Sequence, residues 1–529
     1  MDEIAADSVL VNGRIVTLDP GCPRAKALAI ASDRIVAVGG DREILRLRDR
    51  RTKVVDLRRA TVVPGLVDAH AHLDREGLKY LYPSLARCRS IADIQVVIRR
   101  LARTRRRGEW IVTMPVGTPP FYMDAPGGLR ERRWPTRADL DAAALARAGI
   151  GRDTAPPKGV EIVRDAAGEP TGVFVEHNLI QVLEFTLMRS APRFTHADRL
   201  TALTDSQRRY AARGVTAIYE GHGVAPELLA VYREAHERGT LRLRAFLAVS
   251  PTWDAADAGR AIPEVAAWAG GRGLGDDRLR VAGICLHYGG DPEVAHILHA
   301  AQPYTGWAGF VESANSPEAY REQAELAARH RLRVNTLVTR NLAQVLDVWE
   351  KIAQSTPIAG LRWVAVHLNA ATGDQLARLK RLGAVATTNP ISYLWRSAAE
   401  EARKLGDAAG TLLPHRSLER VRLPFGLATD NKPADPWLAF RAVVERSDMT
   451  SGEILGPRER LTRLAALRAL TVGGAFITFA ERERGVLAPG RQADLAVVDQ
   501  DPLTMPLAEI GSLACRLTMV GGRVVHGDD

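Results

Sequence analysis

The chain has 529 residues, of which 46% are hydrophobic, so it is long enough to bury a large core and a smaller second unit. It has no run of about 18 apolar residues, and it opens without the basic and apolar segments of a signal peptide. We therefore expect a cytoplasmic protein with no membrane partner. The four cysteines are too few and too scattered for a disulfide framework, so we expect them to be reduced.

The net charge of +10 raises the question of a nucleic-acid partner. The densest basic segment, residues 99–107, continues a helical pattern that begins at Ile91, and this predicts a solvated helix face. No nucleic-acid fold motif accompanies it, so we expect no nucleic-acid partner. An anionic substrate is compatible with the excess of arginine, which does not by itself indicate one.

The first predicted elements are short strands over residues 11–16 and 34–39. A buried strand follows over residues 61–63, and a Pro-Gly step leads from it into Val67-Asp68-Ala69-His70-Ala71-His72. Residues i and i+2 of a strand point to the same side, so the two imidazoles can converge on one cation. This spacing predicts a site for zinc, iron or manganese. The alternative is a pair of hydrogen-bonded histidines beside a turn.

Alternating strand and helix patterns continue to about residue 470. That order indicates a parallel barrel, in which catalytic residues lie at the carboxyl ends of the strands. His72, His287, His367 and Asp430 all lie at such ends. The predicted strands cover residues 110–116, 214–219, 241–249, 279–287, 332–338, 361–367, 383–388 and 423–430, with helices such as 317–330 between them.

The segment around His70 and His72 resembles the first barrel strand of the amidohydrolase superfamily of metal-dependent hydrolases. The segments 11–16, 34–39, 485–499 and 520–525 resemble the two halves of the small β-sandwich that flanks the barrel in that superfamily. The chain is most similar to the amidohydrolase-3 branch, which includes N-substituted formamide deformylases, in its segments 137–141, 168–173 and 214–216.

The resemblance implies an α/β fold with a TIM-like (β/α)8 barrel over residues 61–470 and a β-sandwich domain formed by residues 1–60 and 471–529. Relatives insert a strand and a His-Gly turn where residues 140–143 here run almost directly into 144–150. We therefore expect a distortion of the barrel, with its second strand or part of the substrate lid shortened.

The segment 425–430 resembles the last catalytic strand of the superfamily. The resemblance implies that Asp430 takes a proton from a metal-activated water and hands it to the departing amine. His367 matches the strand histidine that serves a second metal or the substrate carbonyl. The alternatives are an aspartate that caps the turn before Pro433 and a hydrogen-bonded core histidine.

Two departures from the superfamily concern the middle strands. Many relatives carry a carboxylated lysine on the fourth strand, where this chain has Cys285, and it has no lysine at all between Lys158 and Lys351. A thiolate is a strong zinc ligand, so Cys285 either holds metal or is a small buried hydrophobe. The histidine that relatives place on the fifth strand is Leu337, which cannot bind a metal; His287, two residues past Cys285, is expected to compensate.

Two further pairs complete the candidate site. Glu220 and His222 lie two residues apart at a strand end, and we predict that they touch the metal or the substrate. Trp395 and Arg396 lie in a turn that we predict to contact the substrate. The alternative is that this turn only packs on its own barrel.

Together these residues predict a mononuclear enzyme, with His70, His72 and Asp430 around one ion and Cys285 or His287 completing the set. Zinc is the expected ion, with iron or manganese as alternatives. The expected reaction is hydrolysis of a C–N bond in a small-molecule amide, formamide or cyclic amide, and the resemblance implies a homodimer. Two alternatives stay open: a metal-dependent cyclase, isomerase or C–C bond-cleaving enzyme, and a non-catalytic small-molecule-binding barrel.

Overall fold

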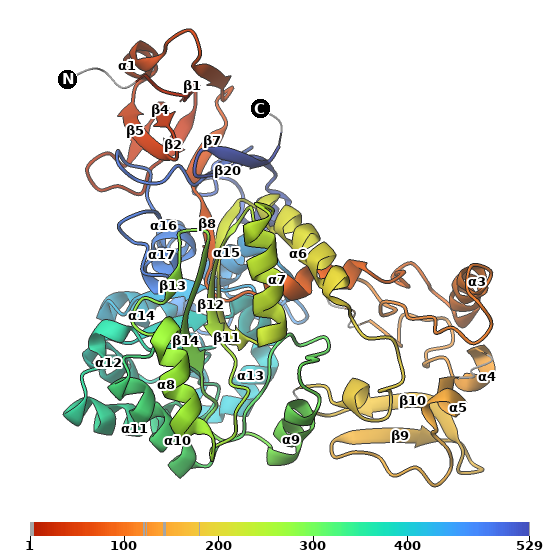
Figure 1. Ribbon diagram of the computed structural model, residues 1–529. Coiled ribbons are helices and arrows are strands. Elements are labelled where there is room, and N and C mark those ends of the chain that lie inside the picture. The colour runs from red at the N-terminus through yellow and green to blue at the C-terminus, as the bar shows by residue number, and fades with distance from the viewer. Residues whose placement is uncertain (1–4, 120–121, 123, 141–143, 179, 528–529) are drawn as a thin grey trace.

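The structure, a computed structural model, describes residues 5–119, 122, 124–140, 144–178 and 180–527. A β-sandwich lies at one end of the molecule, a barrel of parallel strands surrounded by helices lies below it, and a lobe projects from the side of the barrel (Figure 1). The predicted α/β fold, a TIM-like barrel with a small β-sandwich, is confirmed.

Eight parallel strands form the barrel, with each strand next to the one that follows it along the chain. Backbone hydrogen bonds from Ala69 N to Leu427 O (3.1 Å) and from Asp430 N to His70 O (3.0 Å) join the last strand to the first. The strands are β8 (Leu66–Asp68), β11 (Val215–Val224), β12 (Arg244–Val249), β14 (Leu279–Cys285), β15 (Val334–Leu337), β16 (Val364–Val366), β17 (Val385–Thr388) and β18 (Phe425–Leu427), and β13 (Leu274–Gly275) pairs with β14 at the edge.

These strands form where the sequence has short apolar runs, because a parallel strand is covered on both faces and needs no polar alternation. Every residue of β11 and β12 is buried. Inside the barrel, Tyr219, Phe246, Val364 and Val385 belong to one apolar cluster. The carboxyl ends of the strands are thereby fixed by a packed interior rather than by loops.

Helices alternate with the strands and begin at residues suited to capping. Thr195 and Thr372 each accept a hydrogen bond from a backbone N–H of the first turn, in α6 and α12 respectively. The helices of the barrel region are α2 (Leu73–Glu76), α6 (His196–Ala211), α7 (Pro226–Glu237), α8 (Ala258–Ala269), α9 (Pro292–Ala300), α10 (Pro317–Arg329), α11 (Leu342–Ser355), α12 (Gly373–Arg381), α13 (Ala398–Leu405), α14 (His415–Val421), α15 (Pro436–Glu445), α16 (Arg463–Arg468) and α17 (Gly474–Ile477). Among the described helices, none is both long and apolar enough to cross a membrane.

The β-sandwich combines strands from the two ends of the chain. In its larger sheet β7 pairs with β2 on one side and with β19 on the other, so that Val62 faces Val497. The strands are β1 (Ser8–Val11), β2 (Arg14–Val16), β3 (Arg24–Ala25), β4 (Ala27–Ala31), β5 (Arg34–Gly39), β6 (Lys53–Asp56), β7 (Thr61–Pro64), β19 (Leu495–Val498), β20 (Cys515–Val520) and β21 (Arg523–His526), with helix α1 (Asp41–Ile44) beside them. The domain boundaries proposed at residues 60 and 470 stay a prediction.

The lobe lies between α2 and α6 in the chain (Figure 1). It contains α3 (Ile91–Ala102), α4 (Arg137–Leu140), α5 (Ala144–Ala148) and a hairpin of β9 (Val160–Arg164) and β10 (Pro170–Glu176). The predicted strand over residues 110–116 is wrong, because only Val116 pairs, in an isolated bridge to Leu85. The second barrel strand is β11, which has 10 residues, so the lack of the segment that relatives insert has not shortened this strand.

Candidate metal centre

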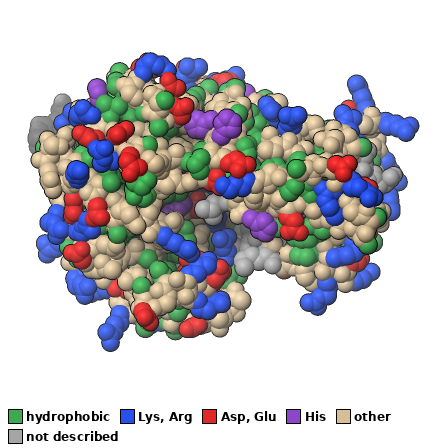
Figure 2. Space-filling model, turned by 90° about the horizontal axis from the view of Figure 1, so that it is seen from below, with side chains coloured by type: hydrophobic (Ala, Val, Ile, Leu, Met, Phe, Trp, Pro, Cys, Tyr) green, Lys and Arg blue, Asp and Glu red, His purple; other side chains and the backbone are tan. Residues whose placement is uncertain are grey.

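Five histidines and two carboxylates lie at the carboxyl ends of the barrel strands. His70 and His72 follow β8, Glu220 and His222 end β11, His287 follows β14, His367 follows β16, and Asp430 follows β18. Each of these side chains is at least nine-tenths buried. Figure 2 views the molecule from this end, where the surface is hollowed between the body of the barrel and the lobe.

Two overlapping groups of potential metal ligands occur among the described residues. In each group the three ligand atoms lie within 4.8 Å of one another; one contains His70, His72 and His222, and the other contains His70, His367 and Asp430. Asp430 Oδ1 lies 3.1 Å from His72 Nε2 and 3.8 Å from His70 Nε2. Ligands about 2 Å from one ion lie roughly 3–4 Å from each other, so each group, taken by itself, has a spacing close to what one metal ion requires.

The hydrogen bonding of His70 and His367 is incomplete. His70 Nδ1, His70 Nε2 and His367 Nε2 are buried and have no hydrogen-bond partner in the described part of the chain. Burial holds the pKa of His70 well below its ordinary value and lowers the pKa of His367 to about 4. Both rings are therefore neutral at pH 7, with a lone pair available, which is the form that binds a metal. The residues present fit a divalent metal ion.

His367 and Asp430 also share an unusual backbone conformation. Their φ angles are 58° and 51°, in the left-handed region that residues with a Cβ rarely adopt. Such conformations cost on the order of 1–3 kcal/mol each and concentrate at functional sites. Each of these two residues contributes a potential ligand atom, and each lies where the chain turns sharply after a barrel strand.

His72 lies between two carboxylates. Its Nδ1 is 2.6 Å from Glu220 Oε2, and its Nε2 is 3.1 Å from Asp430 Oδ1. Burial and Arg75 oppose protonation of His72, but Glu220 and Asp430 outweigh them and raise its pKa. Burial also opposes ionisation of Asp430, but Lys432, His72 and His367 hold the pKa of its carboxyl well below the ordinary value. Asp430 is therefore an anion in the resting site.

A bulge in β11 positions His222. The register with β12 shifts between Glu220 and Val224, and Gly223 within it has a φ of 91°. A Cβ at Gly223 would lie 2.7 Å from the backbone nitrogen of Ser250, so only glycine fits there. The His222 ring stacks on Phe310 with 3.8 Å between centroids.

The structure brings neither Cys285 nor His287 into the two groups of potential ligands. His287 Nε2 lies 3.4 Å from His222 Nε2, beside the groups. Cys285 is fully buried, and burial, with Glu220 and Glu312 nearby, raises the pKa of its thiol well above the ordinary value. The ligand roles predicted for Cys285 and His287 stay predictions.

Trp395 ends the turn of π-helix Ile391–Trp395, which follows β17, and Arg396 is the next residue. The guanidinium of Arg441, on α15, lies 4.7 Å above the Trp395 ring. Among the contacts of the described residues, none joins Trp395 or Arg396 to the histidines. Their substrate-binding roles stay predictions.

Asn431 and Lys432, which lie beside Asp430, were missed in the sequence. Lys432 Nζ lies 2.6 Å from Asp430 Oδ2, and Asn389 Nδ2 donates to the same oxygen at 3.3 Å. Asn431 accepts a hydrogen bond from His72 N and donates one to His72 O. Lys432 and Asn431 directly follow the predicted catalytic aspartate, and that adjacency was the available signal.

Another missed residue is Glu312, which no motif indicates. It lies between α9 and α10, with Oε1 4.0 Å from His287 Nε2. Burial raises the pKa of the Glu312 carboxyl to about 7. This loop reaches the histidines only through the tertiary fold.

The sequence profile described as the amidohydrolase family matches residues 53–526. The chain is 26% identical to an N-substituted formamide deformylase of Arthrobacter pascens over 98% of this chain and 97% of the relative. A crystal structure of an uncharacterized metal-dependent hydrolase from Pyrococcus furiosus matches 94% of this chain and all of that chain, with 22% identity and a TM-score of 0.68. An atrazine chlorohydrolase from Arthrobacter aurescens, complexed with zinc, matches 98% of this chain and 95% of that chain, with 16% identity and a TM-score of 0.53.

Proposed function

Because the chain belongs to the amidohydrolase family, we propose that it is a metal-dependent hydrolase that cleaves a C–N bond in a small amide, formamide or cyclic amide. The observation that carries the proposal is the pair of buried potential-ligand groups that share His70, a residue whose two ring nitrogens have no hydrogen-bond partner in the described chain. The choice of bond is supported by the similarity to an N-substituted formamide deformylase over nearly the whole chain.

The proposed centre holds one ion, with His70, His72 and Asp430 as ligands and His222 completing the set. His222 is preferred to Cys285 because its nitrogen lies within 4.8 Å of the ligand atoms of His70 and His72. Zinc is the first choice, supported by the zinc complex of the atrazine chlorohydrolase, and iron and manganese remain alternatives. When bound, such an ion supplies a Lewis acid that makes hydroxide available near neutral pH.

Residues of the chain itself supply the proton transfer and the contact with the substrate carbonyl. Asp430 is ionised, and it can accept a proton from water at Oδ2 and pass it to the departing nitrogen. Lys432 and Asn389 contact that oxygen and hold the carboxylate in place. His367 is a neutral imidazole whose Nε2 has no partner in the described chain, so the tautomer with its proton on Nε2 can donate a hydrogen bond to the substrate carbonyl oxygen.

The test combines metal content with isotope incorporation. Elemental analysis of protein purified without chelators should find about one zinc, iron or manganese per chain, and His70→Ala should lose it. A panel of N-substituted formamides, N-acyl amines and cyclic amides, hydrolysed in H₂¹⁸O, should yield a carboxylate product that carries one solvent oxygen. Cys285→Ser should retain the ion if His222 completes the set and should lose it if the thiolate does.

Two outcomes would overturn parts of the proposal. Turnover that requires the ion but incorporates no ¹⁸O would favour a cyclase, an isomerase or a C–C bond-cleaving enzyme. A chain that holds no ion and turns over nothing, yet binds members of the panel, would favour a binding barrel.

A further inference from the structure

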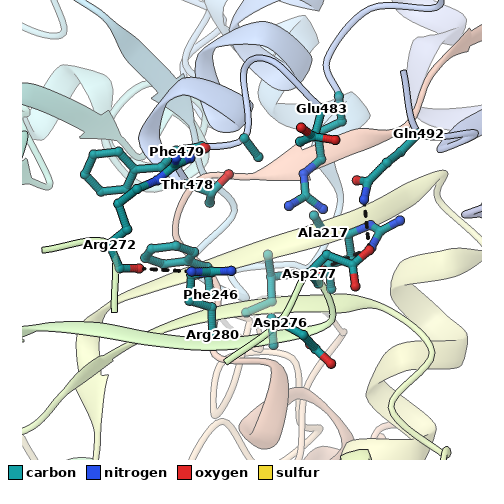
Figure 3. Close-up of a pocket in the computed structure, with 15 residues that line it drawn as sticks. Ala217, Phe246, Arg272, Asp276, Asp277, Arg280, Thr478, Phe479, Glu483 and Gln492 are labelled. Atoms are coloured by element: carbon teal, nitrogen blue, oxygen red, sulfur yellow. Dashed lines mark hydrogen bonds and ion pairs between the residues drawn. The ribbon is translucent and has the colours of Figure 1, made fainter. Parts of the chain in front are cut away.

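A cavity of about 90 Å³ lies at the amino ends of β11, β12 and β14, the opposite end of the barrel from the metal centre. The segment 478–492, which leads from the barrel to the sandwich, closes it. Figure 3 shows Arg272 and Phe479 on one side, Glu483 and Gln492 on the other, and Asp276, Asp277 and Arg280 below. The side chains of Asp276 and Asp277 are about half exposed, so they mark the opening to solvent.

The lining has more positive charge than its carboxylates neutralise. Each lining carboxylate has its own partner, since Asp277 contacts Arg244, Asp276 Oδ2 lies 3.1 Å from His236, and Glu483 Oε2 lies 2.9 Å from Arg34.

Two of the lining arginines have no such partner. Arg272 donates to the Phe479 carbonyl and Arg280 to the Arg272 carbonyl. Within the described part of the chain, neither of them has an ion pair shorter than 4.0 Å.

Arg484 is the buried member of this lining. Its side chain is 10% exposed, and its Nε and Nη1 have no hydrogen-bond partner in the described residues. The nearest carboxylate, Asp494, lies 3.8 Å from Nη1 and already accepts two hydrogen bonds from Arg244 and one from Gly521 N. Burial lowers the pKa of Arg484 to about 10, so at pH 7 it remains a buried cation with unused donors.

Gln492 adds an unused acceptor to the same cavity. Its Nε2 donates to Asp277 Oδ2 at 2.8 Å, while its Oε1 is buried and has no partner in the described chain. A water molecule could satisfy single donors or acceptors, but it would leave Arg484 with only the carboxylate of Asp494, which it shares with Arg244, to offset its charge. An oxyanion that keeps a proton, such as hydrogen phosphate, supplies negative charge, several acceptors and one donor.

We propose that this cavity binds a small oxyanion of the phosphate class, with Arg484 as the central donor, Arg272 and Arg280 as further cations, and Gln492 Oε1 as the acceptor for its proton. The bound group is either free phosphate or the phosphoryl group of a small metabolite. Because the cavity lies between the barrel strands and the segment that leads to the sandwich, occupancy stabilises the junction of the two units.

The test measures binding of inorganic phosphate to the full chain by isothermal titration calorimetry. It also measures the melting temperature (Tm) with added phosphate, sulfate or chloride at constant ionic strength. Phosphate should raise Tm saturably, whereas chloride should not, and sulfate, which lacks the proton near pH 7, should bind more weakly. Arg484→Gln should weaken phosphate binding at least tenfold. Arg482→Gln removes the same charge from an exposed residue two positions away, so it should bind phosphate as the wild type does.

A second arm compares free phosphate with glycerol phosphate. Tighter binding of the ester assigns the cavity to a phosphorylated metabolite, and exclusion of the ester assigns it to the free ion. If Arg484→Gln does not fold, the more exposed Arg272→Gln should still weaken binding several-fold. No heat of binding, or equal Tm shifts with phosphate, sulfate and chloride in wild type and Arg484→Gln, would overturn the proposal and leave a cavity filled by water.

Discussion

His70 and His72 lie two residues apart and have opposite hydrogen-bond environments. His72 contacts carboxylate oxygens through both ring nitrogens, whereas neither ring nitrogen of His70 has a partner among the described residues. A buried polar atom that lacks a partner costs about 1–3 kcal/mol. His70 therefore gains most from an ion, and it is the residue on which metal retention should depend most strongly.

His70→Ala should lower the metal content from about one ion per chain to less than about a tenth, and amide hydrolysis by more than about 100-fold. Elemental analysis and initial rates on the same preparation measure both. His296→Gln, at an exposed histidine of α9, is the matched control and should change neither. Full metal retention in His70→Ala would contradict the assignment.

His415 should make stability depend on pH independently of the metal centre. It is fully buried, its Nε2 lies 3.0 Å from Thr388 Oγ1, and burial, with Arg446 nearby, holds its pKa well below the ordinary value. Below about pH 6.5 this histidine is protonated in the unfolded chain but stays neutral in the folded chain. The free energy of unfolding therefore falls as the pH falls.

The comparison is with His415→Gln, which cannot take up that proton. The Tm of wild type should fall more steeply than that of the variant between pH 7.5 and 5.5, so the difference between the two should change steadily with pH. Parallel Tm curves, measured by scanning calorimetry, would show that the pKa of His415 is the same in the folded and the unfolded protein.

How well single residues could be predicted depended on how local their signals are. His70 and His72 stand in one short motif, and His367 and Asp430 follow recognisable apolar strands, so the sequence was enough to place all four at strand ends. Glu312 and Phe310 reach the histidines from a loop between α9 and α10, and their contacts depend on how that loop packs over the barrel. The spacing of Cys285 and His287 correctly indicated one strand end, but it could not show that both side chains lie outside the two groups of potential ligands.

At the scale of elements, the site depends on how strands end rather than on loop sequence. β16 and β18 are followed by left-handed residues, and β11 contains the bulge that presents His222. Apolar runs were enough to locate all these strands. Residues 110–116 are also apolar, yet Pro115 cannot donate to a ladder and only Val116 pairs, so composition alone gave a false strand.

Gly223→Ala should disturb the bulge and thereby the metal centre. The new Cβ would lie 2.7 Å from Ser250 N, so β11 must shift near His222. Gly239→Ala is the matched control, because Gly239 also has a positive φ, 66°, but no atom within 4 Å of the added Cβ. The control should lose about 1–2 kcal/mol of stability from backbone strain and keep its metal. Gly223→Ala should lose more stability than the control and bind metal at least several-fold more weakly. Competition with a chelator measures the metal affinity. Equal behaviour of the two variants would argue against a role for the bulge.

At the scale of the whole molecule, a buried ion pair joins the barrel to the segment that enters the sandwich. Arg244, at the start of β12, donates to both carboxylate oxygens of Asp494 at 2.8 and 2.9 Å, and both side chains are at least 97% buried. Burial opposes ionisation of Asp494, but Arg244 outweighs it and lowers the pKa of that carboxyl. The two units are therefore coupled by charge as well as by packing.

Asp494→Asn should destabilise the protein by about 3–5 kcal/mol, because it leaves the buried Arg244 with only the half-exposed Asp277 as a partner and removes the carboxylate nearest to Arg484. Asp499→Asn, at a more exposed ion pair with Arg516, should cost about 0–1 kcal/mol. Denaturant unfolding of both variants measures the difference. A cost of less than about 1 kcal/mol for Asp494→Asn would show that the pair couples the units only weakly.

The sandwich sheet also has a consequence for synthesis of the chain on the ribosome. β7 ends at Pro64, and its partner β19 begins at Leu495. The ribosome adds about 5–20 residues per second, so β7 lacks its partner β19 for on the order of tens of seconds after β7 has left the ribosome. An open strand edge can pair with a neighbouring nascent chain. The growing chain thus carries an unpaired strand edge until β19 has been synthesised, and during that interval the edge can promote aggregation.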